Sequence, residues 1–301
     1  MGVLKDAITQ IICGFFANLF SEAILSHSKT KDKVVVIEKP VVINNELKMD
    51  LQPSEQQPKS NSVYSVVNRF LELFQSHGIL ITQIQSFVDP KFKLKLDDLK
   101  DNESILKILT EELIDWTCNI FGIQKGWIQC DSSSIYPYRN YYKNIHEFVK
   151  LLKALKKECQ VDMYVLKDGD LNSKDEREQN IIMILRIPIK KFNNRLIYRY
   201  LPISTLWNWG YWRSRYQAKA IFFICEKLHI VMKGFNLGKQ EIIGISSGHS
   251  FPESLLKELP LGYTWYPEDY IDLPSESCCS KDTFETDQVR EYIQSEGYLN
   301  I

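Results

Sequence analysis

The segment NIIMILRIPIKKFNNRLIYRYL, residues 180–201, decides the fold class. Its first part, up to Ile189, is almost continuously apolar, as in a strand that is buried on both faces. Asn193 and Asn194 have the composition of a tight turn, and residues 195–201 follow them as a second strand. The segment therefore predicts a β-hairpin, which in turn favours an antiparallel sheet.

The segments on both sides of this hairpin alternate between helical and strand periods. The sequence predicts helices at 144–158 and 214–228, a strand at 161–166, and a second strand pair at 230–235 and 241–246. Helices and strands are thus mixed, without the regular alternation that a parallel sheet requires. We expect residues 131–275 to form an α+β domain with a mainly antiparallel sheet.

Residues 61–130 show only helical patterns. An apolar stripe that includes Phe70 and Phe74 ends at Gly78, and a short helix is predicted at 81–88. A longer helix is expected to start at Asn102 and to end at Gly122. A polar, proline-punctuated linker (26–60) precedes this helical module, and the acidic residues 276–301 read as a tail.

The N-terminus carries a wide apolar stripe at three-to-four spacing, which predicts an amphipathic helix over residues 1–25. Its apolar positions are interrupted by Asn18 and Glu22, so the segment lacks the uninterrupted run of about 20 residues that spans a bilayer. Such a helix packs on the protein, self-associates through residues 3–25, lies on a membrane surface, or is a cleaved secretory signal. The sequence leaves these alternatives open.

Charge is distributed unevenly along a chain whose net charge is only −1. Residues 188–240 carry ten basic residues against a single acidic one, Glu226, whereas residues 241–301 carry three basic and twelve acidic residues. Aromatic residues alternate with the basic ones between positions 195 and 219. Guanidinium groups bind phosphate or carboxylate with a planar fork, and neighbouring aromatic rings stack on bases.

This basic window predicts a binding site for an anionic, nucleotide-like ligand or for single-stranded nucleic acid. The candidate residues are Arg195, Arg199, Arg213, Arg215, Lys219, Trp212 and Tyr216. Arg213 and Arg215 are expected at the start of a helix, where free backbone N–H groups also favour an anion. The alternative is that these cations pair with the acidic C-terminal segment, because the two charge excesses nearly cancel.

Motifs for catalysis and metals are weak. Ser246 lies in a G-x-S-x-G pattern, but the only histidine after it is His249, three residues on. Asp162, Asp168 and Asp170 are the carboxylates of greatest interest for an undetected enzyme acting on nucleotides or nucleic acid, although their surroundings read as a solvated loop. The sequence has no P-loop and no G-x-G-x-x-G or H-E-x-x-H motif, so we expect no cofactor, no metal and no catalytic residue.

The seven cysteines are dispersed and form no C-x-x-C pair, which indicates a reducing, cytoplasmic location.

Part of the helical module resembles the helix-turn-helix domain of the Xre/Cro family. The matching segments are FLELFQSHG (70–78), ITQI (81–84), LIDWTCNIFGI (113–123) and WI (127–128). The resemblance covers residues 63–128 and implies a small helical bundle. Its recognition helix would fall within residues 93–101, where Asp97, Asp98 and Asp101 would face phosphate. Residues 61–130 have a net charge of −2, so we expect protein contacts rather than duplex DNA binding.

Together these features predict a non-enzymatic intracellular regulator or sensor. Its helical module would contact a protein partner, and its α+β domain would bind the anionic ligand. The alternatives are an effector that self-assembles or attaches to a membrane through its N-terminal helix, and an enzyme that the motifs do not reveal.

Overall fold

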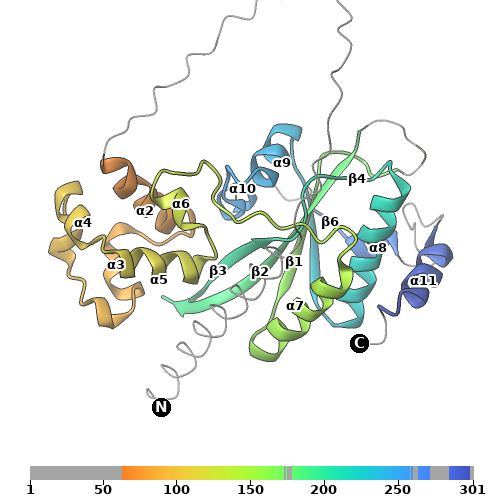
Figure 1. Cartoon of the computed structure of the whole chain (residues 1–301), viewed down its shortest axis with the longest axis horizontal. Coiled ribbons are helices and arrows are strands. Elements are labelled where there is room, and N and C mark those ends of the chain that lie inside the picture. Colours follow the sequence, from red (N-terminus) through yellow and green to blue (C-terminus); the bar gives the residue numbers. More distant parts are fainter. Residues whose placement is uncertain are drawn as a thin grey trace, which may run out of the picture. The chain divides into compact units, whose positions relative to one another are not determined.

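A computed structural model describes residues 63–172, 174, 178–257, 259, 264–271 and 285–298 (Figure 1). The helix predicted over residues 1–25 and the linker predicted over 26–60 lie outside these residues. Helices and a mainly antiparallel sheet make up the described chain, so the α+β prediction is confirmed. None of the helices in the described ranges is both long and apolar enough to cross a membrane.

The helical module packs around a cluster of phenylalanines. It contains helices α2 (Tyr64–Ser76), α3 (Ile81–Phe87), α4 (Asn102–Ile108), α5 (Glu111–Phe121) and α6 (Lys125–Ile128), with 3-10 helices η1 (Pro90–Phe92) and η2 (Leu96–Leu99). Phe74 lies at the centre and makes edge-to-face contacts with Phe70, Phe87 and Phe121, at centroid distances of 4.9, 5.9 and 5.3 Å. The predicted end of a helix at Gly122 is confirmed, because this glycine caps α5 in the left-handed conformation (φ 71°).

The single long helix predicted from Asn102 to Gly122 is wrong. The chain leaves the helical conformation at Leu109, and Thr110 starts α5 by accepting a hydrogen bond from the backbone N–H of Leu113 at 3.3 Å. Asp101, rather than Asn102, caps α4 through the N–H of Ser104. Two capping side chains therefore divide one continuous apolar pattern into two helices. Residues 93–101, where the Xre/Cro resemblance places a recognition helix, contain the 3-10 helix η2.

The sheet has the strand order β3-β2-β1-β5-β6 in the described residues, and β4 pairs with β2. The strands are β1 (Asp162–Lys167), β2 (Asn180–Phe192), β3 (Arg195–Pro202), β4 (Trp207–Asn208), β5 (Val231–Asn236) and β6 (Thr264–Trp265). The predicted β2–β3 hairpin is confirmed, with positive φ angles at both Asn193 and Asn194. Asparagine tolerates this left-handed conformation, which a two-residue hairpin turn needs.

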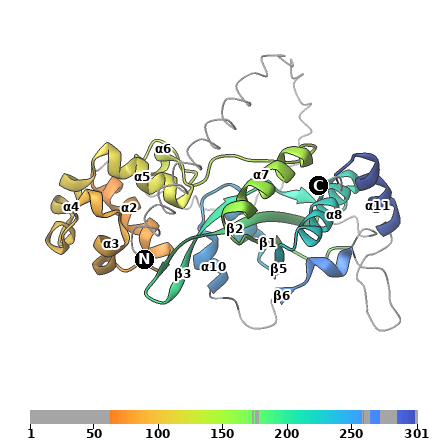
Figure 2. The ribbon, with the colours of Figure 1, turned by 90° about the horizontal axis from the view of Figure 1, so that it is seen from below.

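Both faces of the sheet are covered. On one face, helices α7 (Ile145–Glu158) and α8 (Trp212–Lys227) lie side by side (Figures 1 and 2), and Cys225 of α8 contacts Met163 of β1. On the other face, Tyr164, Ile184 and Tyr200 join the hydrophobic core of the helical module. Because each face packs against helices, β2 is apolar at successive positions, as its sequence suggested.

The strand predicted at residues 241–246 is wrong, and so is its pairing with β5. Residues 241–246 belong to helix α9 (Lys239–Ser246), not to a strand, because Ile242 and Ile245 are buried at helical spacing and Glu241 accepts a hydrogen bond from the N–H of Gly238. The antiparallel partner of β5 is instead β6. Gly234 of β5 permits this pairing, since a Cβ there would lie 2.4 Å from the ring of Trp265.

The predicted tail 276–301 contains a further helix, α11 (Thr286–Ser295). Val289 and Ile293, four positions apart, are buried, and α11 packs against α8. This apolar pair is too short to stand out in an otherwise acidic sequence. The remaining short elements are α10 (Pro252–Lys257) and the 3-10 helix η3 (Pro267–Tyr270).

Candidate anion-binding surface

The structure does not bring all seven predicted binding residues together. Arg195 and Arg199 lie on β3 and bind the helical module to the sheet. The guanidinium of Arg195 donates to the carbonyl of Gly78, and that of buried Arg199 donates to the carbonyl of Asn119 at 3.3 Å. These two arginines therefore make contacts inside the fold.

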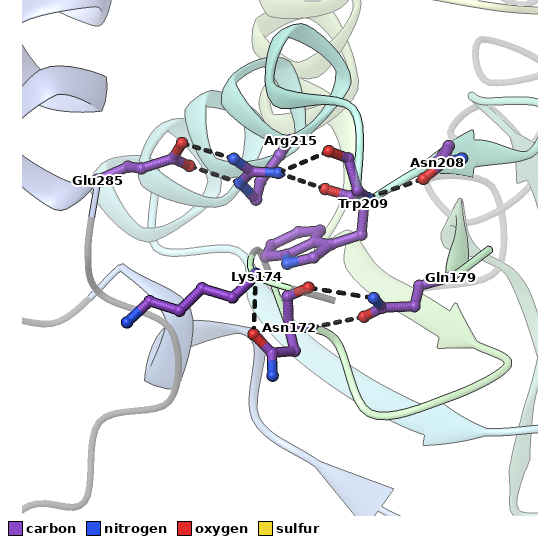
Figure 3. Close-up of polar contacts among 8 residues, drawn as sticks. Asn172, Lys174, Gln179, Asn208, Trp209, Arg215 and Glu285 are labelled. Atoms are coloured by element: carbon purple, nitrogen blue, oxygen red, sulfur yellow. Dashed lines mark hydrogen bonds and ion pairs between the residues drawn. The ribbon is translucent and has the colours of Figure 1, made fainter. Parts of the chain in front are cut away.

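Arg215 is buried and its hydrogen-bonding capacity is used within the protein (Figure 3). Its Nε and Nη2 atoms each lie 2.5 Å from a carboxylate oxygen of Glu285, and Nη1 donates to the carbonyls of Trp209 at 2.6 Å and Gly210 at 3.3 Å. Both side chains of the ion pair are nearly inaccessible, with exposures of 5% for Arg215 and 9% for Glu285. The sequence left open whether the basic residues pair with the acidic C-terminal segment. Arg215 does so, through its ion pair with Glu285.

Lys219 follows Arg215 by one helical turn and is completely buried. Its ammonium group lies 5.6 Å from the ring centroid of Trp209, whose backbone carbonyl also accepts from Arg215. The inner face of α8 thus carries two cations that face the protein interior. Neither is placed to meet a ligand from solvent.

The exposed residues at the start of α8 form a different arrangement. Tyr211 is 45% exposed, Trp212 is 47% exposed, and Arg213 is exposed beside them. Tyr142 and Lys143, in the loop before α7, extend the same surface, since the Tyr142 side chain hydrogen-bonds that of Tyr211. We call these five residues the aromatic–basic surface.

Within the aromatic–basic surface, each cation lies close to an aromatic ring. The guanidinium carbon of Arg213 lies 4.3 Å from the ring centroid of Trp212, and its Nη1 lies 3.1 Å from the hydroxyl of Tyr211. The ammonium group of Lys143 lies 5.5 Å from the ring centroid of Tyr142. Burial and the adjacent hydroxyl of Tyr211 raise the pKa of Tyr142. The Tyr142 hydroxyl therefore remains neutral at physiological pH, and Arg213 and Lys143 give the surface positive charge.

The surface is supported from beneath by hydrogen bonds and ring contacts. Buried Gln217 of α8 accepts from the backbone N–H of Lys143 at 3.0 Å and donates to the hydroxyl of Tyr292 at 2.5 Å. Tyr216, the remaining predicted site residue, packs edge-to-face on Trp212 with centroids 5.4 Å apart. These contacts fix the loop before α7 against the first turn of α8, so the exposed rings have a defined arrangement.

Sequence reasoning identified Trp212, Arg213 and Tyr216 but missed Tyr142 and Lys143. The missed pair is about seventy residues away in the chain and reaches α8 only through tertiary packing. The signal that could have drawn attention to it is the aromatic and basic run YRNYYK at residues 138–143.

The carboxylates considered for catalysis do not converge. Asp162 pairs with Arg186 at 3.4 Å at one end of β1, while Asp168, beyond the other end, accepts hydrogen bonds from the backbone and side-chain amides of Asn180. Asp170 is fully exposed. In the described part of the chain no three His, Cys, Asp or Glu side chains are grouped so that they could hold a metal ion.

Ser246 lies in the last turn of helix α9 rather than in a strand-to-helix turn. The imidazole of His249 contacts the hydroxyls of Ser247 at 3.0 Å and Ser133 at 3.2 Å, and no hydrogen bond to Ser246 is seen among the described residues. The geometry thus differs from that of a nucleophile elbow, in which the serine directly follows a strand.

Comparisons of the chain with protein-family models, with curated proteins and with solved structures found no match.

Proposed function

We propose that this protein is a non-enzymatic regulator or sensor that recognises a nucleotide-like anion on the aromatic–basic surface. The observation that carries the proposal is the exposure of Tyr211 and Trp212 directly before exposed Arg213 in the chain, beside the loop that buried Gln217 holds through Lys143. Large exposed aromatic groups are costly to leave in water, and clusters of them mark recognition sites.

The chemistry of the surface fits a base that carries phosphate. Trp212 offers an indole face on which a base can stack, and stacking contributes about 1–3 kcal/mol per base. Arg213 supplies a planar fork for phosphate, and Lys143 supplies a second positive charge. A single nucleotide and a single strand share this chemistry. They differ in that a strand engages both cations at successive phosphates, so that affinity rises with strand length.

The regulatory role rests on the combination of this surface with the helical module. Part of the module's sequence resembles a DNA-binding domain, but the module's net charge of −2 favours a protein contact over duplex DNA. We place the protein in the cytoplasm, where thiols such as those of Cys118 and Cys225, which are free in the structure, stay reduced. Residues 3–25 are proposed to mediate self-association or membrane attachment.

The test is equilibrium binding of a fluorescein-labelled oligothymidylate to the full chain, followed by anisotropy, with unlabelled mononucleotide as competitor. Trp212→Ala should weaken binding about tenfold or more, because it removes one stacking platform. The matched control is Tyr266→Ala, which removes another exposed aromatic ring (65% exposed) on a different element. Equal affinities for the wild type and Trp212→Ala would overturn the proposal.

A charge control separates recognition from simple attraction. Arg213→Lys keeps the charge but loses the fork, so it should bind more weakly than the wild type, whereas exposed Lys153→Ala on α7 should change affinity little. Unchanged affinity in Arg213→Lys together with weaker binding in Lys153→Ala would mean that binding is only a response to net charge.

A further inference from the structure

A second polar site shares no residue with the aromatic–basic surface. It is a pocket of about 280 Å³ between the 134–139 loop, the residues that connect β3 to β4, and the end of α9. Its polar lining includes one guanidinium group and several hydroxyls, among them Ser134, Tyr136, Arg139, Ser204, Thr205 and Ser247. Drug-sized ligands occupy pockets of about 300–1,000 Å³, so this pocket suits a smaller molecule.

The walls of the pocket are held by backbone contacts. The N–H of Ile135 donates to the carbonyl of Gly248 at 2.7 Å, and the carbonyl of Ile135 accepts from the N–H of Gln124 at 2.9 Å. Gly248 has a positive φ of 75°, and a Cβ on it would lie 2.3 Å from the hydroxyl of Ser134. Only glycine therefore fits at this point of the wall, and the 134–139 loop is fixed before any ligand arrives.

The hydroxyls differ in what they can offer to a ligand. Ser134 and Ser247 donate to the carbonyls of Tyr136 and Ile243, so their oxygens remain as acceptors. Ser204 instead accepts from the backbone N–H of Met183 at 2.8 Å, which leaves its hydrogen as a donor. The pocket thus combines donors suited to an oxyanion with acceptors suited to the hydroxyls of a ligand.

Two further observations point to a charged, polar occupant. Arg139 lines the pocket, and burial lowers the pKa of its guanidinium to about 10, so an anion nearby would stabilise its charged form. The buried hydroxyl of Tyr136, another lining residue, has no hydrogen-bond partner among the described residues. Buried polar groups of this kind are normally satisfied by a ligand or by ordered water.

We propose that this pocket binds a small hydroxylated phosphomonoester, whose phosphate pairs with Arg139 and whose hydroxyls meet the serine oxygens. The site is independent of the aromatic–basic surface, because the two share no residue. It would give the protein a second ligand, a small molecule, to which it could respond.

The experiment measures binding to the full chain by isothermal titration calorimetry, with glycerol 3-phosphate, inorganic phosphate and glycerol as probes. Glycerol 3-phosphate should bind saturably and more tightly than inorganic phosphate, and glycerol should not bind. Arg139→Gln should weaken the binding of glycerol 3-phosphate by about tenfold or more, because a charge-assisted contact is lost.

Two more variants keep the result interpretable. Thr205→Phe fills the pocket while leaving Arg139 in place, and it should abolish binding even if Arg139→Gln fails to fold. Trp212→Ala should bind glycerol 3-phosphate as the wild type does, whatever its effect on nucleotides. No saturable binding of either phosphorylated probe, or the same affinity in Thr205→Phe as in the wild type, would overturn the proposal.

Discussion

Arg213 and Arg215 are two residues apart on the same helix and have opposite environments. Successive helical residues turn by about 100°, so these side chains project in directions about 200° apart. Arg215 points inward and forms a two-pronged ion pair with Glu285, whereas Arg213 points outward beside Trp212. The comparison teaches that a basic window in a sequence can contain both a structural cation and a recognition cation, and that only burial distinguishes them.

The largest expected effect is on the buried side. Arg215→Ala leaves the carboxylate of Glu285 buried without its partner, and the loss of such a partner costs about 3–5 kcal/mol of unfolding free energy. Arg213→Ala is the matched control and should change stability by no more than about 0.5 kcal/mol. Chemical denaturation of Arg215→Ala and Arg213→Ala measures both effects. Similar losses of unfolding free energy in Arg215→Ala and Arg213→Ala would contradict the view that only Arg215 is structural.

The same contrast between a buried and an exposed residue applies to His77 and His146, and it predicts how stability depends on pH. Burial lowers the pKa of His77 from 6.5 to about 4, against the raising effects of the Leu73 carbonyl and of Glu253. The pKa of His77 in the folded state lies below its value in the unfolded state. The free energy of unfolding is therefore at its full value above pH 6.5 and decreases as the pH falls toward 4. The loss amounts to about 3 kcal/mol.

Urea denaturation between pH 7.5 and pH 4 measures how the free energy of unfolding changes with pH. His77→Phe, which keeps a ring against Phe121 and Tyr200, should flatten the pH dependence. His146→Gln, at an exposed position on α7, is the control that should leave it unchanged. A slope that persists in His77→Phe would assign the pH dependence to other groups.

A smaller effect is expected when the buried ion pair is weakened rather than broken. Glu285→Gln keeps the shape of the side chain and one acceptor for Arg215, but it removes the charge. We expect a loss of about 1.5–3 kcal/mol, the range for hydrogen bonds to charged groups. A loss equal to that of Arg215→Ala in the same denaturation assay would show that charge, rather than hydrogen bonding, holds α11 against α8.

The sequence predicted the parts of the fold that depend on local patterns. The β2–β3 hairpin followed from a long apolar run and two asparagines, and the helices α7 and α8 followed from their apolar spacing. Helix α9 was mistaken for a strand, because the segment EIIGIS is short and its period is ambiguous. Helix α11 was missed because only two of its apolar residues, Val289 and Ile293, mark its buried face.

The candidate site was predicted only in part, for a related reason. Composition located the basic window correctly but could not assign its cations to the inside or the outside of the fold. That assignment depends on Glu285, seventy residues after Arg215, and on the loop that carries Tyr142 and Lys143. Such long-range contacts leave no mark on the local sequence.

The central claim is that Arg213 acts in binding and not in folding. Its most direct test is urea denaturation of the wild type and of Arg213→Ala, each with and without saturating oligothymidylate, because a ligand that binds only the folded state adds to stability. The account predicts equal stability of the two proteins without ligand, and stabilisation by the oligonucleotide in the wild type alone. Loss of stability in unliganded Arg213→Ala, or equal stabilisation of both proteins by the oligonucleotide, would contradict it.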